Sequence, residues 1–89
     1  MAVKKITLEN GFKAKVETDA MDDMELVEKL AALEDNPLLL PAIITHVLGD
    51  EQKRALYDHL RTEAGRVPVA AVNEALQDLF EKLGEESKN

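Results

Sequence analysis

Two patterns in the sequence predict a mainly α-helical single domain of four helices with a short N-terminal β-hairpin. Near the start, an Asn-Gly dipeptide separates two short runs in which apolar and polar residues alternate, as they do in paired strands. From residue 20 onward, apolar residues recur at spacings of three and four, and glycine or proline interrupts them at intervals typical of helix ends. The 89 residues suit one domain, which we expect to cover residues 1–84, followed by a flexible C-terminal tail over residues 85–89.

The turn of the predicted hairpin is Asn10-Gly11, because this dipeptide supplies the positive φ that a tight hairpin turn requires. The flanking apolar residues alternate with polar ones and would share one face of the hairpin: Ile6, Leu8, Phe12, Ala14 and Val16. A two-stranded sheet is only marginally stable by itself. We therefore expect the hairpin to lie on the rest of the domain.

The first predicted helix runs from about Ala20 to Glu34. Asp19 is suited to cap its N-terminus, and the acidic residues that follow interact favourably with the helix dipole. The apolar residues that recur at helical spacing are Met24, Val27, Leu30 and Ala31. This spacing is typical of an amphipathic helix.

Prolines and glycines divide the remaining chain into three further helices. The second begins at Pro37 or Pro41, since proline fits the first turn of a helix, and Gly49 closes it. Asp50 is placed to cap the third helix, which we expect to stop near Gly65.

The fourth predicted helix starts at Pro68 and ends at Gly84. Its apolar residues fall on a single stripe: Val72, Ala75, Leu76, Leu79, Phe80 and Leu83. At roughly 1.5 to 3 kcal/mol for each large apolar side chain buried, the five large members supply roughly 7 to 15 kcal/mol before opposing terms. Packing therefore holds this helix in place.

The net charge of −7 is distributed unevenly. Residues 1–16 carry four lysines and one glutamate for +3, whereas residues 17–35 carry eight acidic residues and one lysine for −7. An acidic middle repels phosphate backbones, so we expect no nucleic-acid partner. The chain has no cysteine and no apolar run long enough for a signal peptide or a membrane span, which predicts a cytoplasmic protein without a membrane partner.

The residue types that catalysis needs are scarce. There is no cysteine, and the only serine, Ser87, falls in the predicted tail, so nucleophilic catalysis lacks a candidate. His46 and His59 lack the spacing that places two metal ligands on one helix face. A calcium loop opening at Asp19 would need glycine where Met24 lies, and no glycine-rich phosphate loop occurs. We therefore expect no enzymatic activity, no cofactor and no bound metal.

One segment, Leu38 to Leu48, is apolar almost all round its predicted helix. Either it is the central core helix or one side of it is an exposed docking surface, and both can hold for different residues. Two nearby methionines have flexible side chains that would adapt to an irregular partner or fill gaps in the core. The candidate partner-binding residues are Leu38, Leu39, Ile43, Ile44, Val47, Met21 and Met24.

Four short motifs occur together in an order that is similar to a known family. They are residues 22–30 (DDMELVEKL), Leu40-Pro41, residues 48–53 (LGDEQK) and residues 65–68 (GRVP). Together they resemble the small tail-assembly chaperones of siphophages and prophages, mainly of Gram-positive hosts, over most of the chain. This chain departs from the family pattern at Met24, where a tryptophan is expected after the paired aspartates.

The resemblance implies a non-enzymatic chaperone in the host cytoplasm. Such a chaperone binds the long, helix-rich tape measure protein and keeps it soluble until tail tube subunits polymerise around it; the tail tube protein and further copies of the chain are additional candidate partners. An apolar groove would accept amphipathic helices of the client, while the acidic surface keeps the complex dispersed.

An alternative interpretation is a small phage or bacterial regulator that binds protein or DNA. The second helix, Gly49 and the third helix superficially resemble a helix-turn-helix, with four basic residues nearby. These are Lys53, Arg54, Arg61 and Arg66, interspersed with acidic residues that reduce the local charge to +1.

Overall fold

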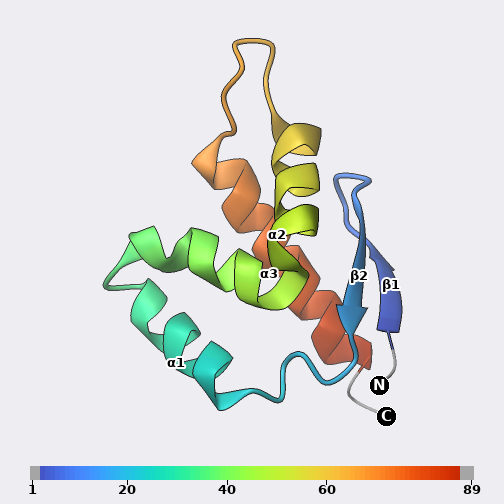
Figure 1. Cartoon of the computed structure of the whole chain (residues 1–89), viewed down its shortest axis with the longest axis vertical. Helices are drawn as coiled ribbons and strands as arrows, with labels where there is room; N and C mark the ends of the chain where they lie inside the picture. Colours follow the sequence, from blue (N-terminus) through green and yellow to red (C-terminus); the bar gives the residue numbers. More distant parts are fainter. Residues whose placement is uncertain (1–2, 87–89) are drawn as a thin grey trace.

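The computed structural model describes residues 3–86, which fold into one antiparallel hairpin and three α-helices (Figure 1). The elements in chain order are β1 (Val3–Thr7), β2 (Lys13–Glu17), α1 (Met24–Leu33), the short 3-10 helix η1 (Pro37–Leu39), α2 (Leu40–Leu60) and α3 (Val69–Glu86). The predicted N-terminal hairpin and the mainly helical character are confirmed. The prediction of four helices is wrong.

The hairpin buries the face that the sequence predicts and turns at Asn10-Gly11, in a three-residue loop over residues 9–11 between the paired Leu8 and Phe12. Gly11 adopts a positive φ of 91°, and the Asn10 side chain accepts a hydrogen bond from the Phe12 N–H at 2.8 Å. In the antiparallel register, Val3 lies opposite Glu17 at one end of the ladder and Thr7 lies opposite Lys13 at the other. The alternating apolar residues are all buried, namely Ile6, Leu8, Phe12, Ala14 and Val16.

The first helix begins at Met24, four residues later than the predicted start at Ala20. Asp23 rather than Asp19 caps it, since the Asp23 carboxylate accepts the Glu25 N–H at 3.0 Å. Residues 18–22 instead form turns between the hairpin and the helix. Both aspartates fit the N-cap preference, so residue type alone could not choose between them.

The apolar face that α1 turns toward the core is also different from the predicted stripe. Leu26 is fully buried, and Leu30 and Leu33 are half-buried against the core. Met24 and Val27 are exposed. Both stripes have helical spacing and both include Leu30, so the packing of α1 against the other elements decides which way the helix is turned.

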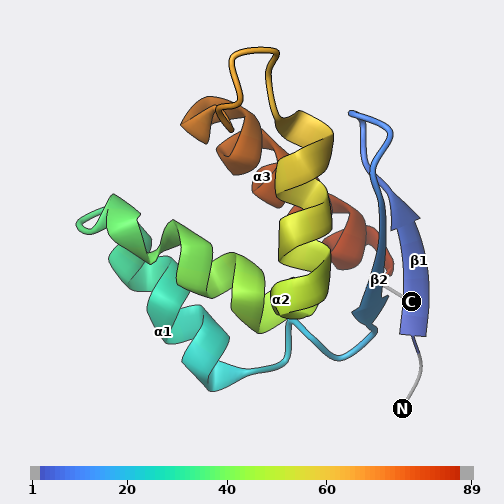
Figure 2. The same cartoon turned by 45° about the horizontal axis from the view of Figure 1, so that its top comes forward.

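The second and third predicted helices are one kinked helix, α2. Its backbone is helical throughout except at Gly49, where φ is 83° and ψ is 164°. No loop residues separate the two halves, so this single positive-φ residue redirects the helix axis instead of ending the helix. Figure 2 shows the two halves of α2 meeting at a steep angle. This is the reason that the four-helix prediction fails.

The loop after α2 begins earlier than predicted. The helix ends at Leu60, and Gly65, with φ of 85°, lies in the loop that follows. Within this loop the Thr62 N–H donates to the Arg66 carbonyl at 2.8 Å, and the Gly65 N–H donates to the Thr62 carbonyl at 2.9 Å. Gly65 therefore serves a turn rather than a helix C-cap.

The last helix, α3, begins directly after Pro68, but it continues through Gly84 to Glu86. Gly84 does not adopt positive φ, so it forms no C-cap, and the prediction that it ends the helix is wrong. The last residues of the predicted flexible tail, 87–89, lie outside the described residues. The predicted stripe is confirmed: Val72, Ala75, Leu76, Leu79 and Leu83 are buried, and Phe80 is half-buried.

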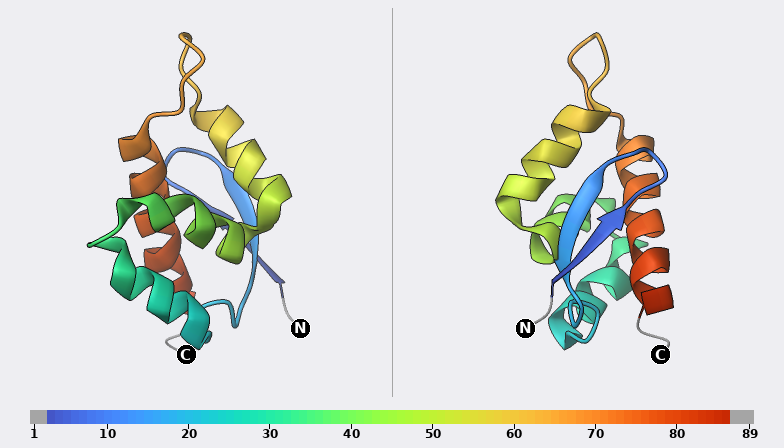
Figure 3. Two further views of the ribbon diagram at one scale, coloured as in Figure 1. Left: turned by 60° about the vertical axis from the view of Figure 1, so that its left-hand side comes forward. Right: turned by 90° about the vertical axis from the view of Figure 1, so that its right-hand side faces the viewer.

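The hairpin lies on one side of α3, while α1 and the first half of α2 lie on the other (Figure 3). The core consists of the inner face of the hairpin together with apolar side chains of all three helices. Within residues 3–86, no helix combines the length and the apolar character needed to span a membrane.

Gln52 fastens β2 to α2. Its Oε1 accepts the Lys15 N–H at 2.7 Å, and its Nε2 donates to the Lys15 carbonyl at 2.8 Å. The side-chain amide thus pairs with the strand edge as a neighbouring strand would. Nε2 also donates to the Leu48 carbonyl at 2.8 Å, directly beside the kink.

Candidate functional site

The seven residues predicted to bind a partner are spread between core and surface. Ile43 and Ile44 are 0% exposed and belong to the core, so a partner cannot contact them while the domain is folded. Leu38, in η1, is 86% exposed, and Met24, at the start of α1, is 69% exposed. Only the latter pair is freely accessible to a partner.

The other three predicted residues are half-buried. Met21 packs against the core. Val47 lines a polar pocket beside the hairpin. Leu39 lies at a shallow hollow beside α1 whose other residues are Glu25, Glu28, Lys29 and Ala32. The structure does not bring these three together.

An open apolar groove of about 580 Å³ lies between α1 and η1 on one side and the start of α3 on the other. Its apolar lining consists of Leu30, Leu33, Pro37, Leu40, Val69 and Ala70, and its polar lining of Glu34, Asn73 and Gln77. Its volume lies within the range of roughly 300 to 1,000 Å³ that is usual for ligand sites. We call this feature the groove.

Exposed apolar residues of α1 lie next to the lining of the groove without being part of it. Val27, which is 46% exposed, precedes Leu30 by three residues, and Met24 precedes Val27 by three, so these side chains are neighbours on the helix surface. Ala31, also exposed, follows Val27 by four. Across the groove, Val69 is 74% exposed. We call Met24, Val27 and Ala31 the outer stripe of α1.

The sequence analysis missed Val69 and the groove as a whole. One signal was present: α1 carries apolar residues at more positions than a single buried face can accommodate. The inner leucines and the outer stripe occupy different sides of the helix, and only one of these sides is covered.

Acidic side chains accompany this apolar surface. Glu25, Glu28, Glu34 and Asp35 are all exposed on or just after α1. A partner that carries lysine or arginine beside its apolar residues would therefore meet opposite charge here.

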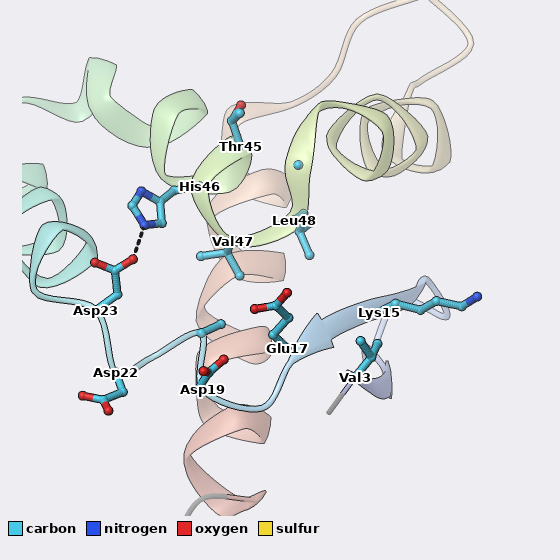
Figure 4. A pocket seen from close by; sticks show the side chains of 12 residues that line it. Val3, Lys15, Glu17, Asp19, Asp22, Asp23, Thr45, His46, Val47 and Leu48 are labelled. Atoms are coloured by element: carbon cyan, nitrogen blue, oxygen red, sulfur yellow. Dashed lines mark hydrogen bonds and ion pairs between the residues drawn. The ribbon is translucent and has the colours of Figure 1, made fainter. Parts of the chain in front are cut away.

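A second pocket, of about 680 Å³, lies between the hairpin, the turns after it and the first half of α2 (Figure 4). Its lining is polar and includes four carboxylates, those of Glu17, Asp19, Asp22 and Asp23, together with His46. In Figure 4 the His46 ring points toward Asp23, while the Asp22 carboxylate points away from both.

His46 links α1 to α2 through two hydrogen bonds. Its Nε2 lies 2.8 Å from Asp23 Oδ2, and its Nδ1 lies 3.0 Å from Lys29 Nζ. A lysine ammonium can only donate, so Nδ1 accepts and Nε2 carries the hydrogen that Asp23 accepts. The hydrogen bond from His46 lowers the pKa of Asp23; desolvation opposes this shift, and the Glu25 N–H adds to it.

The hydroxyl and imidazole groups near this pocket are engaged in structural hydrogen bonds. The Thr45 hydroxyl donates to a main-chain carbonyl at 3.0 Å rather than to His46. Among residues 3–86, no group of three or more histidine, aspartate or glutamate side chains is placed to hold a metal ion. The other histidine, His59, lies with Nε2 2.8 Å from the Asn10 carbonyl and so holds the hairpin turn. Both histidines fasten structural elements together.

Of the groove and the polar pocket beside the hairpin, the groove is the better candidate for a partner site. Its apolar lining continues onto exposed apolar side chains, whereas the histidine and one carboxylate of the polar pocket already satisfy one another. Comparison with known proteins adds no relative, because no protein-family model, no curated protein and no solved structure matches this chain.

Proposed function

We propose that this chain is a non-enzymatic tail-assembly chaperone of a siphophage or prophage, which binds helical segments of the tape measure protein in the host cytoplasm. The observation that carries the proposal is the groove together with the outer stripe of α1. The resemblance of the sequence motifs to this chaperone family points to the same kind of client.

A groove of this kind suits an amphipathic helix. A helical client presents apolar anchors at spacings of three and four, which can enter the groove while its polar face stays in water. Fully burying a large apolar side chain is worth roughly 1.5 to 3 kcal/mol, so covering Val27 and Val69 stabilises the complex by a few kcal/mol before the entropic cost of association.

The charge of the chain supports the second half of a chaperone's task, which is to keep the complex dispersed. The net charge of −7 gives each bound copy a repulsive surface. Acidic residues on α1 lie beside the outer stripe, so a client bound there would be flanked by negative charge.

The test is co-expression with a helical fragment of the tape measure protein. We expect the native chain to raise the soluble fraction of the fragment, and Val27→Asp and Val69→Asp each to reduce that effect. Each variant should also weaken binding to the fragment at least about tenfold, equivalent to about 1.4 kcal/mol. Both side chains are exposed, so neither variant should unfold the domain.

The matched control is Val3→Asp, which makes the same change at an exposed valine on the hairpin, away from the groove. This variant should keep the fragment soluble. Equal loss of solubility with Val3→Asp, or none with the two groove variants, would contradict the proposed site.

The alternative function, a regulator with a helix-turn-helix-like segment, has less support. Lys53 lies 3.4 Å from Asp50, and Arg61 lies 3.0 Å from Asp58, so half of the four basic residues are paired with carboxylates of the same helix. We expect no measurable binding to duplex DNA near physiological salt. Micromolar, salt-sensitive binding would favour the regulator instead.

A further inference from the structure

The outer edge of β1 is open. Leu8 and Phe12 form a hydrogen-bonded pair, with the Leu8 N–H donating to the Phe12 carbonyl at 2.8 Å. Hydrogen-bonded and non-hydrogen-bonded pairs alternate along an antiparallel ladder, so Val3, Lys5 and Thr7 direct their N–H and carbonyl groups away from β2. Within residues 3–86, these backbone groups have no hydrogen-bond partner.

Two neighbouring outward positions, Lys15 and Glu9, are occupied. The backbone groups of Lys15, on the far edge of the hairpin, pair with Gln52. The Glu9 N–H, next in the outward series after Thr7, donates to Asp78 Oδ2 of α3 at 2.7 Å. Asp78 also accepts a hydrogen bond from Lys82, which lowers its pKa most, followed by the bond from Glu9. On β2 the outward groups of Lys13 are also without a partner within residues 3–86, but Gln52 covers the next outward position, so the longest free stretch of edge is on β1.

The exposed face of the same hairpin carries three lysines and one glutamate, Glu17, and is therefore basic on an acidic protein. Lys5 and Lys15 lie directly opposite each other, and Lys13 is the diagonal neighbour of Lys5 on that face. Like charges placed opposite one another destabilise a strand pair. No ion pair involves these three side chains within the described part of the chain. A partner with negative charge would relieve the repulsion.

We propose that β1 accepts an extended acidic segment of a partner protein as a third strand. The backbone of that segment would pair with Val3, Lys5 and Thr7, and acidic residues at alternate positions would lie beside the lysines of the exposed face. Main-chain hydrogen bonds would supply affinity, and the lysines would select for charge. The site is separate from the groove and does not depend on the function proposed for it.

Other occupants fit this edge less well. A second copy that paired β1 with β1 around a two-fold axis at Lys5 would place the two Lys5 side chains against each other. A nucleic acid could meet the lysines but has no backbone groups that complete a β-ladder, and the net charge of −7 opposes it.

The experiment titrates the isotope-labelled full chain with a capped seven-residue peptide of alternating glutamate and valine at low ionic strength, followed by NMR. We expect chemical shift changes centred on the amides of Val3, Lys5 and Thr7, and slower hydrogen exchange at the Lys5 and Thr7 amides. The same peptide with lysine in place of glutamate should bind at least about tenfold more weakly.

Two pairs of variants separate charge from strand pairing. Lys5→Glu should weaken binding at least about tenfold, whereas Arg54→Glu, the same charge change at an exposed position of α2, should not. Thr7→Pro removes one outward N–H, which edge strands tolerate, and should weaken binding, whereas Thr7→Ala should not.

The proposal is overturned if both peptides bind equally, if the shifts map to the groove, or if amide exchange at Lys5 and Thr7 is unchanged by the glutamate peptide. A short DNA duplex that produces the same shifts with equal affinity would assign the face to nucleic acid. Shifts that appear on concentrating the chain without peptide would assign the edge to a second copy.

Discussion

Replacement of Gln52 by alanine should loosen the hairpin from α2. The substitution removes three hydrogen bonds of 2.7 to 2.8 Å, two to Lys15 and one to the Leu48 carbonyl. A hydrogen bond contributes about 0.5 to 1.5 kcal/mol net. The Lys15 groups lie at an exposed edge where water can replace the amide, so we expect a loss of about 1 to 2 kcal/mol in total, a fall in Tm of roughly 5 to 15 °C.

Thermal and urea unfolding followed by circular dichroism measure this loss, and hydrogen exchange locates it at the Lys15 amide. Glu51→Ala is the matched control, because the neighbouring side chain is exposed and makes none of these bonds. Gln52→Glu keeps an acceptor for the Lys15 N–H but turns an oxygen toward two carbonyls. The loss in free energy of unfolding caused by Gln52→Glu should therefore be largest at neutral pH. It should become smaller as acidification protonates the new carboxyl, which can then donate a hydrogen bond.

A change in the free energy of unfolding of less than about 0.5 kcal/mol in Gln52→Ala, the usual range for surface substitutions, would contradict the role given to Gln52. An equal loss of stability in Glu51→Ala would contradict it as well. An exchange rate at the Lys15 amide that does not rise in Gln52→Ala would show that the strand edge is held by something else.

Three further predictions concern stability. Gly49→Ala should destabilise by about 1 to 3 kcal/mol, because a φ of 83° with a ψ of 164° is a backbone conformation that essentially only glycine adopts. Gly84→Ala, in right-handed helix with open space for a Cβ, should stabilise by up to about 1 kcal/mol, and urea unfolding distinguishes the two variants. Ile44→Asp should cost more than about 4 kcal/mol by burying a charge, but Leu38→Asp less than about 0.5, as thermal melts can verify. The pKa of Asp78 is lowered in the folded protein, so its ionised carboxylate stabilises the fold at pH values above the ordinary pKa of 3.8, and this stabilisation is lost as pH falls through the lower folded pKa. Asp78→Asn should therefore reduce the dependence of the free energy of unfolding on pH in the acid range, and an unchanged slope would refute this.

The hairpin was predictable because its determinants are local. Asn10 and Gly11 set the turn, and the alternation on either side fixes which face is buried. The stripe of α3 was predictable for the same reason, since a period of 3.6 over many residues leaves little choice of face. In both segments the local pattern agrees with the tertiary packing.

Gly49 illustrates where sequence reasoning stops. A glycine with positive φ ends a helix when the chain then leaves, and kinks it when the next residues resume the helix. The choice here depends on contacts with a distant strand, since Gln52 pairs with Lys15. Gly84 poses the converse case: it tolerates a C-cap conformation, but the helix continues through it.

The groove could not be predicted from the sequence because residues of four elements, α1, η1, α2 and α3, form it. Leu33, Pro37 and Val69 come together only after α1, η1 and α3 pack, and none of them carries a local signature of a binding site. The segment from Leu38 to Leu48 did carry such a signal, but most of its large side chains turn toward the core. All-round apolarity marks a central helix more reliably than a docking face.

The kink at Gly49 lies between two sets of side-chain hydrogen bonds that hold α2 to its neighbours. The Asp23–His46–Lys29 chain couples α1 to the first half of α2, whereas Gln52 couples the second half to the hairpin. One buried cluster joins both halves of α2 to α1, α3 and the hairpin, so the kink holds α1 and η1 in a fixed direction relative to α3. The shape of the groove thus depends on the one position in α2 whose backbone is not helical.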